Sequence, residues 1–164
     1  MIDLDPVADT AVLRQAYGCF PSGVTAVCAV RDGAPVGIAA SSFTSVSVDP
    51  PLVSLCVQST STTWPQLADR ERLGVSVLGS TQGAACRQIA SKTHDRFAGV
   101  GWGATAQGAV LLHDAAAWLD CSVYEVLPAG DHKLVLLRVH ALRMHSDIAP
   151  LVFHASGFRG LAAA

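Results

Sequence analysis

The chain has 164 residues, which fits one domain of ordinary size. Hydrophobic residues make up 51% and charged residues 15%, a balance that excludes a disordered chain, a coiled coil and a charged tail protein. The net charge of -2 with scattered basic residues argues against nucleic-acid binding, and no apolar run reaches the roughly 18 residues of a membrane-spanning helix.

Apolar runs that are β-branched or alternate with small residues predict six strands. They cover residues 23–30, 36–38, 52–57, 73–78, 116–127 and 133–144. Residues 31–35 and 128–131 have the composition of tight turns and join the first two and the last two of these strands. The tail, residues 150–160, alternates weakly and could add a seventh strand.

Helical spacing is confined to short segments. It predicts a helix over residues 10–19 with Asp9 or Thr10 as N-cap, a second from Pro65 to about residue 69, and a third over residues 81–90. Six or seven strands with regular turns and few helices favour an antiparallel sheet closed on itself, because closure removes exposed edges. The prediction is a mainly β fold, a small closed β-barrel with short peripheral helices.

The cysteines and the N-terminal segment indicate the compartment. The five cysteines are odd in number and form no CxxC pair, which argues against a disulfide framework and a zinc site. Each lies among small or apolar residues, so we expect five small buried side chains. The first residues are acidic and resemble no secretory signal, and a cytoplasmic protein is expected.

Two clusters of hydroxyl side chains follow predicted strands. Residues 41–47 carry five hydroxyls and a run of backbone donors that can face a planar, hydrogen-bond-rich ligand; a solvated serine-rich loop is the alternative. Residues 59–63 precede the second predicted helix. Their hydroxyls and free backbone N–H groups could hold a phosphate, or they could only cap the helix.

One histidine stands out by its position. His132 follows the turn at 128–131 and opens a strand, where a side chain can project into the mouth of a barrel; a purely structural histidine is the alternative. No HExxH, GxSxG, GxxxxGK[ST] or GxGxxG motif occurs. Metal-dependent, hydrolase and P-loop functions are therefore not supported.

Four segments, taken in order, resemble the flavin reductase family of two-component monooxygenases. They are FPSGVT at 20–25, GIAASSFTSVSVDPPL at 37–52, DRFAGV at 95–100 followed by Trp102, and GDH at 130–132. The resemblance covers about residues 12–158, and its long second block is the most specific part. It implies one flavin reductase-like domain over residues 1–164, built as an FMN-binding split β-barrel with short peripheral helices.

The resemblance also implies a set of cofactor-binding residues. The isoalloxazine ring and ribityl chain would lie against Ser41, Ser42, Phe43, Thr44 and Ser47, with Ser22 near the ring edge. The phosphate would be held by Ser59, Ser61 and Thr62, assisted by Lys92 or Arg96. The nicotinamide site would be bordered by His132, His154 and Phe158, and Ala40, Gln58 and Trp64 complete the set.

The implied activity is hydride transfer from C4 of NADH or NADPH to N5 of FMN or FAD. Reduced flavin would then pass to a partner monooxygenase, with no part for nucleic acid or membrane. Such a transfer needs no side-chain nucleophile, and His132, the one residue assigned to catalysis, would orient the nicotinamide coenzyme. A homodimer is implied too, and the apolar excess agrees with a subunit interface. The alternative is a flavin-binding split-barrel protein without reductase turnover, such as a flavin carrier or a pathway accessory enzyme.

Overall fold

The computed structural model describes residues 1–92 and 95–161. Within them the helices are α1 (Thr10–Gly18), α2 (Trp64–Leu67) and α3 (Gly83–Ala90). The strands are β1 (Ser22–Gly23), β2 (Thr25–Arg31), β3 (Ala34–Ala40), β4 (Thr44–Ser47), β5 (Leu52–Gln58), β6 (Leu73–Val77), β7 (Trp102–Ala104), β8 (Val110–Leu112), β9 (Ala117–Ala129), β10 (His132–Met144), β11 (Val152–His154) and β12 (Gly157–Arg159). The prediction of a mainly β fold with few helices is confirmed.

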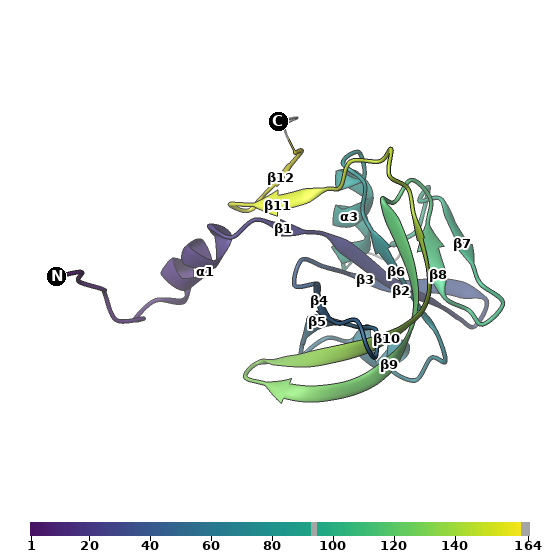
Figure 1. The fold of residues 1–164 in the computed structure, drawn as a ribbon, viewed down its shortest axis with the longest axis horizontal. Coiled ribbons are helices and arrows are strands. Elements are labelled where there is room, and N and C mark those ends of the chain that lie inside the picture. Colours follow the sequence, from purple (N-terminus) through teal and green to yellow (C-terminus); the bar gives the residue numbers. More distant parts are fainter. Residues whose placement is uncertain (93–94, 162–164) are drawn as a thin grey trace.

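The main sheet is antiparallel and has the strand order β3-β2-β6-β9-β10-β5-β4. Figure 1 shows it strongly curved, with the long β9–β10 hairpin sweeping around one side. Two smaller sheets, β1-β11-β12 and β7-β8, lie outside it. The strands predicted over 52–57, 73–78, 116–127 and 133–144 are confirmed as β5, β6, β9 and β10.

The prediction that the sheet closes on itself needs correction. Among the described residues no ladder joins the edge strands β3 and β4, so no barrel is closed by strand pairing. The chain instead turns away after Ala40, and the Ser42 hydroxyl both accepts from the N–H of Cys56 (2.9 Å) and donates to its carbonyl (3.2 Å). A side chain thus bonds the β5 backbone where a neighbouring strand would otherwise pair with it.

Hydrophobic cores lie on both faces of β2. Val27 and Ala29 face an inner cluster that includes Leu55 and Trp64, whereas Ala26 faces an outer cluster beneath α3 and β8. Both faces are therefore apolar, which explains why the sequence over β2 reads as a continuous apolar run. Helices α2 and α3 bury residues against this sheet, but they form no layer of their own.

The sequence reading missed β4, β7 and β8. Strand β4 was read only as a hydroxyl cluster, because as an edge strand it alternates serine and threonine on an exposed surface. Strands β7 and β8 have three residues each and lie in or beside a glycine-rich stretch, too short to show a period of two. In the described residues β4 pairs with its sequence neighbour β5 and β7 with β8, and segments this short or this polar show no strand pattern of their own.

Helix α1 projects from the body of the molecule (Figure 1). Its start is as predicted, because the Asp9 carboxylate accepts a hydrogen bond from the N–H of Ala11 (2.7 Å). No residue of α1 is buried, and Tyr17 and the following Phe20 are largely exposed. No helix in the described ranges has the length and apolar character to cross a membrane.

The expectation of five buried cysteines is confirmed for three of them. Cys28, Cys86 and Cys121 are buried, and burial raises the pKa of each thiol, that of Cys121 to about 12. It is wrong for Cys19, which follows the exposed helix α1, and for Cys56, which is half-buried. Cys56 alternates with Leu55 along β5, so its side chain faces away from the inner core.

Candidate functional site

A cavity of about 720 Å³ opens beside the ends of β3 and β5 and the segment that leads into α2. It contains nine of the residues predicted from sequence: Ala40, Ser41, Ser42, Gln58, Ser61, Thr62, Lys92, Arg96 and His132. The structure therefore brings residues of both hydroxyl clusters, two cations and the singled-out histidine to one place. Its volume lies within the range of small-molecule and cofactor sites.

The two cations of this cavity have no acidic partner in residues 1–92 and 95–161. The ion pairs in these ranges involve other basic groups, so neither Lys92 nor Arg96 has a carboxylate there within 4.0 Å. Arg96 is half-buried, and its Nη1 donates to Thr63 Oγ1 (2.9 Å) and to the Gly37 carbonyl (3.3 Å). A guanidinium held in this way, with its charge uncompensated, is suited to an anionic ligand such as a phosphate.

The hydroxyl cluster at residues 59–63 does not form the phosphate-binding terminus of a long helix. Helix α2 has four residues, too short to act as an extended dipole, and the Ser61 hydroxyl accepts a hydrogen bond from the N–H of Trp64 (3.1 Å). The N-cap is Thr63, whose side chain makes no capping hydrogen bond, and Ser61 instead supplies the acceptor for the first helical N–H. Its hydroxyl hydrogen and the exposed Thr62 side chain remain as groups that can face a ligand.

His132 is fixed by the turn that precedes it. Its Nδ1 lies 2.7 Å from Asp131 Oδ1, and the Asp131 carbonyl accepts a hydrogen bond from the N–H of Ser59 (2.9 Å). Since a carboxylate only accepts, Nδ1 carries the hydrogen, and this bond holds the pKa of Asp131 below its usual value. The ring nitrogen left to a ligand is Nε2.

Eight predicted residues lie outside the cavity. Trp64 is buried in the inner core, and Phe43 packs against that core, because both cover the interior of the curved sheet. The others are on edge strand β4 (Thr44, Ser47), in the loop after β5 (Ser59) or on the small sheet β1-β11-β12 (Ser22, His154, Phe158). Phe158 there packs against Phe153 and lies under Arg87 (5.2 Å).

Three polar residues line this cavity without being among the predicted site residues: Cys56, Thr60 and Thr63. Thr63 lines the cavity and accepts the hydrogen bond from Arg96; it belongs to the hydroxyl cluster at 59–63, which was the signal that could have found it. Cys56 lines the cavity too, but the expectation that every cysteine is a buried core residue excluded it from the predicted site. Because side chains alternate along a strand, the position of Cys56 next to the core residue Leu55 could have shown that its side chain points to the opposite face of β5.

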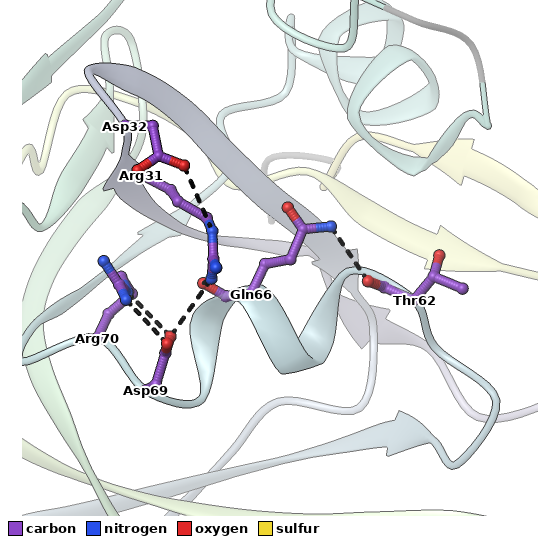
Figure 2. Close-up of polar contacts among 6 residues, drawn as sticks. All are labelled: Arg31, Asp32, Thr62, Gln66, Asp69 and Arg70. Carbon is purple, nitrogen blue, oxygen red and sulfur yellow. Dashed lines mark hydrogen bonds and ion pairs between the residues drawn. The ribbon is translucent and has the colours of Figure 1, made fainter.

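A second cavity, of about 710 Å³, adjoins the first and shares Thr62, Thr63 and Arg96 with it. Figure 2 shows the polar network at its side: Arg31 Nη1 donates to the Gln66 carbonyl (3.3 Å) and lies 3.6 Å from Asp69. Asp69 accepts two hydrogen bonds from Arg70, which lower the pKa of Asp69 and raise that of Arg70. This network ties the end of β2 to the end of α2.

Comparison with known proteins agrees with this geometry. The sequence profile of the "Flavin reductase like domain" matches residues 17–162. The flavin reductase of Pseudomonas putida is 37% identical over 156 residues, covering 94% of this chain and 92% of that protein. The reductase subunit HsaB of a flavin-dependent monooxygenase from Rhodococcus jostii is 34% identical, over 93% of this chain and 78% of that one. A probable flavin reductase of Rhizobium meliloti is 38% identical over 94% of this chain, which spans 47% of that longer protein.

Solved structures give the same result. The NADH:FAD oxidoreductase SgcE6 of Streptomyces globisporus C-1027 superposes with a TM-score of 0.92 at 34% identity, over 100% of this chain and 99% of that one. The matched profile covers most of the chain, including the cavity and the curved sheet. The chain therefore belongs to the flavin reductase like domain family.

Proposed function

We propose that the protein is an NAD(P)H-dependent flavin oxidoreductase that supplies reduced flavin to a partner monooxygenase. The observation that carries this proposal is the 720 Å³ cavity, where two hydroxyl clusters, an oriented histidine and two cations without a carboxylate partner in the described residues meet. Relatives named as reductase subunits or components of monooxygenases, at 33–34% identity over most of this chain, support the same function.

The cavity residues fit a flavin phosphate at one end. Arg96 and Lys92 would neutralise it, and the hydroxyls of Ser61 and Thr62 would donate to its oxygens. The fit rests on the half-buried guanidinium of Arg96, which has no acidic partner in the described ranges, because a phosphate would supply the anion that this positive charge lacks there.

The other end of the cavity fits a flat, largely apolar ring. The end of β3, from Ile38 to Ala40, offers small and apolar side chains, and Ser41 and Ser42 follow with backbone groups that can reach ring heteroatoms. The Ser42 hydroxyl is engaged by Cys56, so its contribution would be to fix this backbone. When bound, the flavin supplies an acceptor for the hydride of the nicotinamide coenzyme.

His132 would act as the positioning residue for the nicotinamide coenzyme. Asp131 holds the ring through Nδ1, so Nε2 can bond the carboxamide or a phosphate of the coenzyme without transferring a proton in the reaction. His154 and Phe158, on the small sheet, remain predictions for the border of this coenzyme site. For the flavin, the remaining predictions are Ser22 near the ring edge and Phe43, Thr44, Ser47, Gln58, Ser59 and Trp64.

We infer further that the protein is a homodimer built from split-barrel domains, with the whole chain forming one unit. A nine-residue helix is shorter than the about 12–15 residues that a free helix needs, and no residue of α1 is buried in the part of the chain that the structure describes. Together with Tyr17 and Phe20, the exposed Leu142 and Met144 of β10 give apolar surface for a second copy to cover. Light scattering should give twice the chain mass, and Tyr17→Asp should lower it, unlike Ala106→Asp in an exposed turn.

An anaerobic titration tests the proposed reaction. The purified protein should oxidise NADH or NADPH only when FMN or FAD is present, and the 450 nm flavin band should bleach. Bound flavin that neither coenzyme bleaches would refute reductase activity and favour a flavin carrier. No flavin binding at all would refute both functions.

A further inference from the structure

The turn that carries Arg96, residues 96–99, is held against strand β3. Phe97 packs in the outer cluster and approaches β3 closely because Gly37 has no side chain: a Cβ there would lie 3.0 Å from Phe97 Cζ. The Arg96 guanidinium donates to the carbonyl of the same glycine at 3.3 Å. These contacts determine where the turn lies, and its backbone shape depends on further hydrogen bonds.

A glutamine of α3 bonds the backbone on both sides of Arg96. Gln88 Nε2 lies 2.6 Å from the Ala98 carbonyl oxygen and 3.4 Å from the Asp95 carbonyl oxygen. Both carbonyls only accept, so the amide N–H groups of Gln88 donate to them. One side chain therefore joins the residue before Arg96 to a residue after it.

We infer that Gln88 is a positioning residue for the phosphate site: it fixes the turn at 96–99, so that the Arg96 guanidinium faces the first cavity before a ligand binds. Gln88 itself lines neither cavity, so it would act only through Arg96. The inference rests on the proposed function, in which Arg96 holds the flavin phosphate. It adds to that site a residue that belongs to none of the motifs found in the sequence.

Helix α3 is a firm support for this contact. Cys86 and Ile89, on either side of Gln88 in the sequence, are buried in the outer cluster and hold the helix against the sheet. Gln88 is half-buried, so water competes less for its two hydrogen bonds than it would at an exposed position. The helix can therefore hold the turn in place through this one side chain.

An arginine that is already held binds a phosphate more tightly than a mobile one. A long side chain on a mobile turn loses backbone and rotamer freedom on binding, and this loss opposes association. Here the guanidinium is bonded to Thr63 Oγ1 at 2.9 Å and the turn is bonded to Gln88, so much of this ordering precedes binding. The net contribution of such neutral hydrogen bonds corresponds to about a three- to tenfold change in Kd.

Removal of the amide donor tests the inference. Methionine in Gln88→Met is unbranched, of similar length and a good helix former, but it offers no donor to the two carbonyls. Gln88→Ala is a second variant that cannot overfill the space. Gln107→Met, in the exposed turn between β7 and β8 and outside both cavities, is the matched control. Thermal unfolding checks that each variant folds.

The dissociation constants of FMN and riboflavin, measured by flavin fluorescence, give the readout. Gln88→Met and Gln88→Ala should each raise the Kd of FMN about three- to tenfold and change that of riboflavin less than about twofold, because riboflavin lacks the phosphate. Gln107→Met should change neither constant. A residue that only stabilises the fold would affect both flavins equally or neither, and either result would overturn the inference.

A double-mutant cycle shows whether Gln88 acts through Arg96. In the Arg96→Gln background, adding Gln88→Met should change the Kd of FMN less than about twofold, since the guanidinium that it positions is absent. An undiminished increase in that background would mean that Gln88 acts by another route, and the inference would be wrong while the reductase function stands.

The remaining outcomes separate the inference from the proposed function. If the selective loss of FMN affinity appears but the wild type oxidises neither NADH nor NADPH, the inference holds and only the proposed turnover is wrong. If Arg96→Gln leaves the Kd of FMN unchanged, Arg96 does not hold the phosphate and the inference fails. If the wild type binds no flavin, the proposed function and the inference fail together.

Discussion

Replacing Arg96 by glutamine is expected to weaken the binding of FMN and to leave that of riboflavin unchanged. The guanidinium lines both cavities, lies half-buried and has no carboxylate partner among the described residues. Glutamine keeps an N–H donor for Thr63 but removes the charge. Because riboflavin lacks the phosphate, it reports any effect of the substitution on the ring site alone.

The magnitude follows from the contacts. Loss of a hydrogen bond to a charged group costs about 1.5–3 kcal/mol, which corresponds to about a 10- to 150-fold increase in the Kd of FMN. The two internal bonds of Arg96, at 2.9 and 3.3 Å, contribute to stability, and their partial loss should lower the free energy of unfolding by about 1 kcal/mol. This smaller effect should not prevent folding at 25 °C.

Fluorescence titration of the wild type, Arg96→Gln and Arg138→Gln measures these constants. Arg138 is an exposed arginine of β10 outside both cavities, so its substitution controls for the loss of one positive charge. Raising the salt concentration should weaken FMN binding to the wild type more than to Arg96→Gln. An equal loss of FMN and riboflavin affinity would refute the assignment of Arg96 to the phosphate.

Three further predictions concern the coenzyme, the packing and the pH dependence. His132→Ala should raise the KM for NADH more than that for flavin, measured in steady-state assays; equal effects would return His132 to a structural role. Gly74→Ala should lower the free energy of unfolding in urea by about 3 kcal/mol or more, since the added Cβ would lie 2.6 Å from the Val110 carbonyl carbon. Gly23→Ala, where nothing lies within 4 Å of the added Cβ, should leave the free energy of unfolding unchanged. The hydrogen bond from His132 lowers the pKa of Asp131, so the charged carboxylate stabilises the fold above about pH 3.8 and this stabilisation is lost as the pH falls further. The wild type should therefore have a higher free energy of unfolding than Asp131→Asn above pH 3.8 but not in stronger acid; a difference that persists in acid would contradict this.

Much of the candidate site could be predicted from sequence because its parts are local. The hydroxyl clusters at 41–47 and 59–63 follow strands that their own alternation reveals, and the turn before His132 has a tight-turn composition. The family resemblance then related these pieces to one ligand. Most residues predicted from these local motifs that line the cavity, such as Ser42, Thr62 and His132, therefore lie where the sequence places them.

The sequence could not separate cavity residues from their neighbours in the same motif. Ser42 and Phe43 are adjacent, yet Ser42 lines the cavity and Phe43 packs on the inner core. Likewise Trp64 follows Thr63 directly and is buried under the sheet. Which side of a strand or turn is the interior depends on strand pairing and curvature, and these are properties of the whole sheet.

By itself the sequence determined the mainly β character, the strand positions with clear alternation, and the family, because each depends on residues close together in the chain. The tertiary structure decided that no ladder joins β3 and β4 in the described residues, that no residue of α1 is buried, and that Arg96 lies between two cavities. Arg96 reaches the Gly37 carbonyl across 59 residues of sequence. Contacts over such separations form only when the whole chain packs, so no local pattern encodes them.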